Sequence, residues 1–512
     1  MADSNPWQDV SLMRFPSLRE DITCDVLVIG GGITGLTAAY LLLKAGKNVC
    51  VIERDQLGSG ETAHTTAHLT CVTDLRLHQI AKTFGRDGAK LTWQGGAAAI
   101  NTIERIVSSE KIDCRFRRIP GFLHESLLSD DSTHEKERDS LQADYELAQD
   151  LHFESSLIPL VDLVQKPGIR FANQAKFHPL LYLSGLAQSI RESGGSIFEQ
   201  TEATDFTENP RHITANGRKI SAEYMVVATH VPVMAEANLI ASTVLQTKLV
   251  PSSTYAVGAL IPRGKYPEAL YWDTSDPYYY LRIDRGTESD YAIFGGADHK
   301  TGQVKDPGDR YTDLEKQLKR LIPETRIERR WSGQVIDTHD GLPFMGETAT
   351  NQFSATGYSG NGMTFGTLAA MMACDAVLGR ENPWKQLFSP SRKTLSSGWD
   401  YLKENFDFPY YMLRDRLVGT DSSSAEDILP GEGKVLMVNE QRVACSRDIS
   451  GRLQSVSAIC THMGCVVHWN PTETTWDCPC HGSRFATSGD VLGGPATDNL
   501  KPVEIQETSD AR

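Results

Sequence analysis

The chain has 512 residues, which is long enough for two or three domains that each bury a core. Its composition, with 40% hydrophobic and 23% charged residues, is ordinary for a globular protein. The net charge of −15 disfavours nucleic acid and anionic membrane surfaces as partners.

The chain carries no obvious targeting segment. No stretch of about 18 or more apolar residues occurs, so we expect no transmembrane segment. The first residues lack the basic and apolar regions of a signal peptide. Ten cysteines in a chain of this length are not typical of a secreted disulfide framework. We therefore expect a cytoplasmic protein.

Residues 25–53 carry the pattern of a dinucleotide-binding unit. Residues 25–30 form a short apolar run that predicts a buried parallel strand, and Gly30, Gly32 and Gly35 give the spacing G-x-G-x-x-G. An apolar helix is predicted over residues 36–45, and a second strand over residues 48–53 ends in Glu53. The glycines let the backbone approach a pyrophosphate at the helix N-terminus, and Glu53 would accept hydrogen bonds from ribose hydroxyls. This pattern alone leaves FAD and NAD both open.

Four further segments resemble, in the same order along the chain, segments of the D-amino acid oxidase family of FAD enzymes, of the glycine and sarcosine oxidase type. They are residues 57–67, 176–180, 224–230 and 353–363, and the resemblance spans about residues 22–380. It implies FAD as the cofactor. The residues expected to bind FAD are Gly30, Gly32, Gly35, Glu53, Arg54, Ser59, His64, Gly357, Asn361, Gly362 and Met363.

The last of these segments has a physical rationale. Residues 357–363 form a glycine-rich turn that opens a predicted helix over residues 364–377. The N–H groups and positive end of that helix would stabilise charge on the N1–C2 edge of reduced FAD. No second G-x-G-x-x-G follows a strand, so we expect electrons to enter from a small substrate rather than from NAD(P)H.

Residues 60–64, Gly-Glu-Thr-Ala-His, match the Gly-x-Thr-x-His string of dimethylglycine and sarcosine dehydrogenases. In those relatives the histidine is attached covalently to the flavin, so the resemblance raises covalent attachment at His64. The alternative is a loop histidine that packs near the flavin without a bond.

The middle of the chain is expected to form the substrate subdomain, because aromatic residues are dense at positions 255, 271–272 and 278–280. In the resembling family an antiparallel sheet covers the flavin, and an arginine or tyrosine on it often holds a substrate carboxylate. Arg282 is therefore a candidate clamp, although an arginine beside strand aromatics equally often covers apolar surface. His339 lies in a family-like segment and is a candidate base.

Near the C-terminus, Cys460, His462, Cys478 and His481 form the pattern C-x-H, fifteen residues, then C-x-x-H. Two thiolates and two imidazoles at this spacing suit a Rieske [2Fe–2S] centre, with both cysteines on one iron and both histidines on the other. A tetrahedral zinc site is the alternative. Zinc fingers usually pair Cys with Cys and His with His along the chain, which favours the iron–sulfur interpretation.

Residues 460–483 resemble the Rieske proteins of cytochrome bc complexes. The resemblance implies a disulfide between Cys465 and Cys480, and a hydrogen bond from Ser483 to a bridging sulfide. The tyrosine that the family carries two residues later is Phe485 here. A missing hydroxyl near a cysteine sulfur removes a bond that stabilises the reduced cluster, so we expect a potential below that of bc-type centres.

The predicted fold is an α/β Rossmann-like FAD-binding domain with an antiparallel-sheet substrate domain, followed by a small all-β Rieske domain. We expect the oxidoreductase domain over residues 1–383, with the substrate subdomain inserted at about 245–330. Connecting helices and a linker are expected over residues 384–427, and the Rieske domain over residues 428–512.

The predicted function is oxidation of a small amine or amino acid by hydride transfer to FAD. Electrons would then pass through the [2Fe–2S] cluster to an external one-electron acceptor protein. Three alternatives stay open. The first is a hydroxy acid or polyol as substrate with the same relay. The second is a flavin oxidase whose Rieske domain is a docking or redox-sensing module. The third is reversed flow from the cluster to the flavin.

Overall fold

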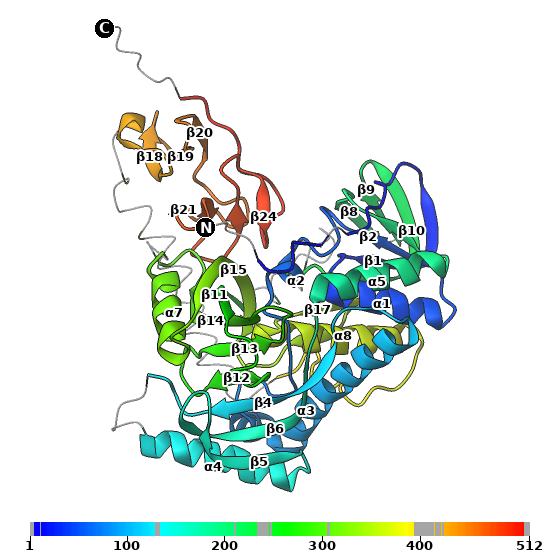
Figure 1. Ribbon diagram of the computed structural model, residues 1–512. Helices are drawn as coiled ribbons and strands as arrows, with labels where there is room; N and C mark the ends of the chain where they lie inside the picture. Colours follow the sequence, from blue (N-terminus) through cyan, green and yellow to red (C-terminus); the bar gives the residue numbers. More distant parts are fainter. Residues whose placement is uncertain are drawn as a thin grey trace.

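The computed structural model (Figure 1) describes residues 5–10, 12–128, 134–208, 211–232, 248–304, 308–393 and 424–505, with Leu245, Arg414 and Asp421. These residues form two large sheets with helices packed around them, and a C-terminal region of two small sheets. Most of the connecting helices predicted within residues 384–427 lie outside the described residues. Residues 384–393, which are described, form turns.

The first large sheet has the strand order β16-β17-β10-β1-β2-β7. The neighbours β17, β10, β1, β2 and β7 pair in parallel, whereas β16 pairs antiparallel with β17, and β8 and β9 extend the edge of β10. The strands are β1 (Ile22–Ile29), β2 (Val49–Ile52), β7 (Ser196–Phe198), β8 (Ala203–Glu208), β9 (Arg211–Ala215), β10 (Arg218–Val227), β16 (Phe344–Ala349) and β17 (Gln352–Thr356).

The predicted strand–helix–strand unit is present, with α1 (Ile33–Lys44) between β1 and β2. Leu27, Val28, Val49 and Val51 are buried, because helices or loops cover both faces of a parallel sheet. Helix α1 is buried along most of its length and packs against α5 (Pro179–Glu192) and α8 (Gly362–Val377). Together these elements place the glycine-rich turn at the carboxyl edge of β1, where a parallel sheet binds nucleotides.

The second large sheet has the order β15-β11-β14-β13-β12-β4-β6-β3, with β5 paired to β6. Its strands are β3 (His68–Leu69), β4 (Arg117–His124), β5 (Ser155–Val161), β6 (Lys166–Lys176), β11 (Leu249–Ile261), β12 (Leu270–Asp273), β13 (Tyr280–Asp284), β14 (Asp290–Lys300) and β15 (Arg326–Thr338). All pairs are antiparallel except β4 with β12. The predicted antiparallel substrate sheet at about 245–330 therefore draws four of its nine strands from residues 68–176.

The two faces of this substrate sheet have different environments. On one face Tyr255 and Val257 pack against α7 (Gly308–Leu321) in a core of their own. On the other face Thr254 and Tyr280 line a cavity. Side chains alternate along a strand, so one face builds the core while the other faces the ligand space.

Other helices within the described ranges are α2 (Glu61–His64), α3 (Leu77–Ser109) and α4 (His134–Asp150), with short 3₁₀ turns η2 (Ser359–Asn361) and η3 (Ala425–Asp427). The C-terminal region (orange to red in Figure 1) pairs β18 (Gly433–Val438), β19 (Gln441–Arg447) and β20 (Leu453–Ser457) in one sheet. Its second sheet pairs β21 (His468–Asn470), β22 (Thr475–Asp477), β23 (Arg484–Phe485) and β24 (Val491–Gly493). This region sits beside β11 and β15 of the substrate sheet (Figure 1).

Candidate active site and cluster-binding loops

One large cavity joins the parallel sheet, the substrate sheet and the C-terminal region. Its volume is about 2120 Å³, well above the roughly 300–1,000 Å³ of common small-molecule sites. Of the predicted FAD-binding residues, all except Gly35 and Gly357 line it. A space of this size can hold a dinucleotide and a substrate together.

The glycine-rich turn has no room for side chains. A Cβ on Gly30, whose φ is +111°, would lie 2.5 Å from Ala228 O, and one on Gly35 would lie 1.9 Å from Gly30 O. Gly35 thus allows α1 to pack tightly on β1, and Gly32 begins the helix without a side-chain cap. The open N–H groups at this helix end suit a pyrophosphate, so the residues fit FAD.

Glu53 directly follows the last residue of β2, beside this turn. Its Oε2 accepts from Gly31 N at 2.7 Å and its Oε1 from Asp55 N at 2.9 Å. Burial raises the pKa of Glu53 despite these two bonds. The carboxylate therefore helps to shape the turn, and its contact with a ribose stays a prediction.

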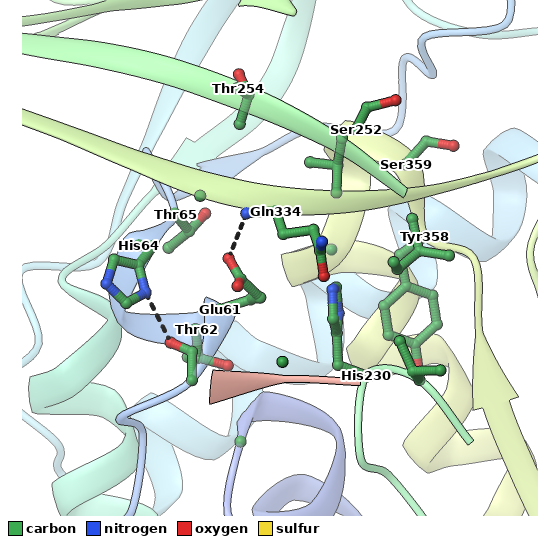
Figure 2. Close-up of a pocket in the computed structure, with 18 of the residues that line it drawn as sticks. Glu61, Thr62, His64, Thr65, His230, Ser252, Thr254, Gln334, Tyr358 and Ser359 are labelled. Carbon is green, nitrogen blue, oxygen red and sulfur yellow. Dashed lines mark hydrogen bonds between the residues drawn. The ribbon is translucent and has the colours of Figure 1, made fainter. Parts of the chain in front are cut away.

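The loop after β2 carries Ser59 and the short helix α2. Figure 2 shows Glu61 bonded through its carboxylate to the backbone N of Gln334, at 2.8 Å. His64 Nδ1 lies 3.2 Å from Gly60 O, and His64 O accepts from Trp331 Nε1 at 2.9 Å. His64 thus lines the cavity on an anchored loop, and its covalent attachment to flavin stays a prediction.

The closing motif leads into α8 as predicted. Gly357 has φ +78°, and a Cβ there would lie 2.4 Å from Thr338 Cγ2. Asn361 accepts from Asp74 N at 3.2 Å and donates to Val72 O at 3.2 Å, so its amide fixes the neighbouring loop rather than capping α8. The helix therefore presents its N-terminal N–H groups to the cavity, next to Gly362 and Met363.

Arg282 does not act as the predicted substrate clamp in this structure. Its guanidinium donates to both carboxylate oxygens of Asp284 at 2.8 and 2.9 Å. The remaining donors bind the carbonyl oxygens of Thr66, Ala67 and Phe177 at 2.8–3.1 Å. All five N–H groups are thus used inside the protein, and the side chain does not line the cavity.

His339, the candidate base, also does not line the cavity, although its neighbours Asp337 and Thr338 do. Other polar residues that sequence reasoning missed are found there. Asp74, Asp298, His230 and Gln334 line the cavity, and Gln334 also contacts the C-terminal region through Gly482. Among these residues, only Asp298 has a signal in the sequence. The glycines Gly295 and Gly296 stand just before it, and a pair of glycines is unusual within a strand.

The four predicted cluster ligands come together at the ends of two loops. The imidazole rings of His462 and His481 lie 4.9 Å apart between centroids, at 88°. The thiols of Cys460 and Cys478 hydrogen-bond to each other, which lowers the pKa of Cys460 to about 7. This donor set of two sulfurs and two nitrogens fits a Rieske [2Fe–2S] cluster.

The disulfide implied by the resemblance is present between Cys465 and Cys480. Their sulfurs lie near that of Cys478 but are bonded to each other, so they are not cluster ligands. Ser483 is fully buried, and its Oγ accepts from Ala496 N at 3.0 Å. Phe485 is also fully buried in the core of this region, with no hydroxyl to offer the cluster.

The cluster-binding loops contact the rest of the protein directly. Gln334 Nε2 donates to Gly482 O at 2.9 Å in buried surroundings, and Gln303 Nε2 donates to Pro479 O at 3.2 Å. His468 Nδ1 donates to Gly302 O at 2.9 Å. The loop of residues 493–495 also lines the cavity. The C-terminal region is therefore docked on the substrate sheet rather than separated from it.

Fold and site together define a flavin-dependent oxidoreductase that carries a Rieske [2Fe–2S] domain. Residues 25–376 match the family model described as FAD dependent oxidoreductase, and residues 421–504 match that of the Rieske [2Fe-2S] domain. The chain belongs to the FAD dependent oxidoreductase family. The Rieske match confirms the iron–sulfur interpretation over zinc.

Several known proteins are similar over most of the chain. The Rieske 2Fe-2S iron-sulfur protein YhfW of Bacillus subtilis is 36% identical over 96% of both chains. Gamma-glutamylputrescine oxidoreductase of Escherichia coli is 27% identical over 79% of this chain and 95% of its own. The crystal structure of glycine oxidase from Geobacillus kaustophilus has a TM-score of 0.60 at 18% identity, over 72% of this chain and 99% of its own. The last of these similarities shows the fold alone.

Among the described residues, none of the helices combines the length and the hydropathy that a membrane crossing requires.

Proposed function

We propose that this protein oxidises a small amine or amino acid with FAD and relays the electrons through its Rieske cluster to an external one-electron acceptor protein. When bound, FAD accepts a hydride, and the cluster carries single electrons. The main support for the electron relay is the hydrogen bond from Gln334 to Gly482, because Gly482 directly follows the cluster ligand His481.

Gln334 connects the two sites through both its backbone and its side chain. Its backbone N bonds to Glu61 on the loop that carries His64, and its amide bonds to the cluster-binding loop. Both bonds are short and at least partly buried, so the flavin loop and the cluster loop are held by the same residue. This arrangement supports direct electron transfer between the two cofactors within one chain.

The Rieske domain also closes the cavity. Arg54, beside Glu53, donates to Leu492 O at 3.3 Å, and residues 490–498 line the cavity wall. A domain that only sensed or docked would not need to form a wall of the flavin site. The contact therefore favours relay over a separate sensing module.

The choice of an amine or amino acid is supported by the relatives. The protein from Escherichia coli is named as acting on gamma-glutamylputrescine, and solved structures of the same fold include glycine oxidase and L-proline dehydrogenase. A hydroxy acid or a polyol is the alternative substrate. These alternatives become outcomes of the test.

The test is anaerobic mixing of the purified protein with a set of amines, amino acids, hydroxy acids and polyols. We expect an amine or amino acid to bleach the flavin absorption, and the electron paramagnetic resonance signal of the reduced cluster to rise afterwards. The proposal fails if no compound bleaches the flavin, or if bleaching is never followed by cluster reduction.

A variant at a cluster ligand separates relay from sensing. His462→Ala should keep substrate bleaching of the flavin but lose electron transfer to an artificial one-electron acceptor. Unchanged turnover in His462→Ala, with oxygen reoxidising the flavin, would instead support an oxidase with a sensing domain.

A further inference from the structure

Two carboxylates, those of Asp74 and Asp298, line the cavity close to each other. Asp74 lies on the loop after β3, and its Oδ1 accepts from the Tyr278 hydroxyl at 2.9 Å. Its Oδ2 accepts from Gly360 N at 2.7 Å. Because Gly360 belongs to the closing turn of the flavin motif, Asp74 stands at the end of the cavity where the flavin ring is expected.

Asp298, on β14, keeps one buried oxygen without a partner. Thr254, labelled in Figure 2, hydrogen-bonds the carboxylate of Asp298 and lies 3.1 Å from the Tyr280 hydroxyl. The other oxygen, Oδ1, is buried and bonded to none of the described residues. A buried carboxylate oxygen without a donor is costly, and a cationic ligand would remove that cost.

The electrostatic surroundings make this end of the cavity acidic. Burial first, and then the carboxylates of Asp337 and Asp74, raise the pKa of Asp298 to about 7. Burial likewise raises the pKa of Asp74 to about 6. The nearby His68 is neutral, because burial and then Arg282 lower its pKa to about 3. Two acidic groups thus share one pocket, and the raised pKa values show that their charged forms are disfavoured unless a cation binds beside them.

Neither Asp298 nor Asp74 has an arginine or a lysine among the groups that most shift its pKa. The lining arginines each pair with an acid: Arg54 with Asp55, Arg76 with Asp144, and Arg484 with Glu473 and Asp477. Among them Arg76 keeps one buried nitrogen, Nη2, that bonds to none of the described residues. Arg282, the predicted clamp, uses all of its donors internally. The pocket therefore favours a cation over an anion.

Aromatic side chains form the wall beside the carboxylates. The rings of Tyr278 and Tyr280 lie 5.6 Å apart, and His68 packs edge-on against Tyr280. Trp272 lines the same cavity and is only 8% exposed, yet its Nε1–H has no partner among the described residues. Such rings attract alkylammonium groups, and an unpaired indole N–H marks a place for a ligand acceptor.

We propose that Asp298 and Asp74 form a cation subsite that selects an aliphatic amine without an α-carboxylate, such as a diamine or a polyamine derivative, over a free α-amino acid. This inference rests on the proposed function and narrows its substrate class. The two carboxylates bind the ammonium group through charge-assisted hydrogen bonds, and the tyrosines flank the alkyl chain. An α-carboxylate in the same place meets two acids.

The first test compares matched compounds on the wild-type protein. Putrescine and ornithine, and cadaverine and lysine, differ only in the α-carboxylate. Binding is measured anaerobically from the change in flavin absorption and from the shift in melting temperature. We expect each diamine to bind at least about tenfold more tightly than its amino acid, since a like-charge contact costs a kcal/mol or more. Equal or tighter binding of the amino acids overturns the proposal.

Two variants test the residues themselves. Asp298→Asn and Asp74→Asn keep the side-chain shape but remove the charge, and each should weaken diamine binding by about 10- to 100-fold. Asp162→Asn, at an exposed position outside the cavity, is the matched control and should bind diamines as the wild type does. If Asp298→Asn does not fold, Asp74→Asn carries the test. Wild-type affinity in both folded variants overturns the proposal.

The outcomes separate this inference from the proposed function. If amino acids bleach the flavin and diamines neither bind nor bleach it, the cation subsite is wrong and the oxidoreductase function stands. If diamines bind in an Asp298-dependent manner but no compound bleaches the flavin, the subsite stands and the proposed reaction fails.

Discussion

At the scale of single residues, Arg282 shows how a reasonable functional prediction can fail on geometry. The sequence places an arginine among strand aromatics, which suits either a substrate clamp or a structural role. The hydrogen-bond partners of Arg282 decide between these two roles. They are Asp284 and the carbonyl oxygens of Thr66, Ala67 and Phe177. Three of these partners lie more than 100 residues away in sequence, so no local pattern could reveal them.

Arg282→Met should therefore lower the free energy of unfolding of the protein, and not only weaken substrate binding. Removing one partner of a buried ion pair costs about 3–5 kcal/mol, because Asp284 and three carbonyl groups lose their donors. Chemical denaturation measures this loss. Arg263→Met, at an exposed position, is the control and should change stability by less than about 0.5 kcal/mol. A variant of normal stability with a raised KM would restore the clamp interpretation.

The same ion pair predicts a pH dependence of stability. Burial raises the pKa of Asp284, but Arg282 and Lys176 outweigh it and hold the folded-state pKa below the ordinary value. The stabilisation is thus complete above the unfolded-state pKa of about 3.9, and is lost as the pH falls through the folded-state pKa. The difference in unfolding free energy between wild type and Asp284→Asn should be constant above about pH 5 and shrink below about pH 4. A difference that grows in acid contradicts the assignment.

The predicted low reduction potential of the cluster depends on Phe485. Its ring is fully buried, at the place where bc-type proteins have a tyrosine. Phe485→Tyr should raise the reduction potential of the cluster, because an added hydroxyl can donate to a cysteine sulfur and stabilise the reduced state. Redox titration followed by electron paramagnetic resonance measures the shift. Phe485→Leu adds no donor and should show no rise, and an equal rise in both variants would rule out the hydroxyl as its cause.

At the scale of helices and strands, the sequence predicted those elements that depend on residues close together in the chain. The alternation of β1, α1 and β2 and the turn before α8 follow from apolar runs and glycines that lie close in sequence. Only the later strands of the substrate sheet were predicted, because β3 to β6 join it through pairings that the sequence does not encode locally. For the same reason the positions of Asp298 and Gln334 could not be predicted, since strand register decides which side chains face the cavity.

A disulfide bond holds the two cluster-binding loops together. The link joins Cys465 to Cys480 across 15 residues, and closing such a loop is worth about 3 kcal/mol in the chain-entropy model. The double variant Cys465→Ser/Cys480→Ser should therefore lower the melting temperature of the Rieske domain and its cluster content. Cys445→Ser, another buried cysteine of the domain that is not disulfide-bonded, is the control for loss of a buried sulfur. Equal losses in the two variants would mean that the link itself adds little.

At the scale of the whole molecule, the docking of the Rieske domain decides whether electrons can pass within one chain. Gln303 and His468 make docking bonds and lie outside the cavity, so they can be changed without altering substrate contacts. Loss of two neutral hydrogen bonds weakens docking by about 1–3 kcal/mol. After anaerobic mixing with substrate, the double variant Gln303→Ala/His468→Ala should bleach its flavin at the wild-type rate but reduce its cluster more slowly. Gln149→Ala, at an exposed position far from the interface, should leave both rates unchanged. An unchanged rate of cluster reduction in the double variant would show that the docked arrangement does not limit electron transfer. Slower bleaching of the flavin would instead show that Gln303 or His468 contributes to substrate oxidation.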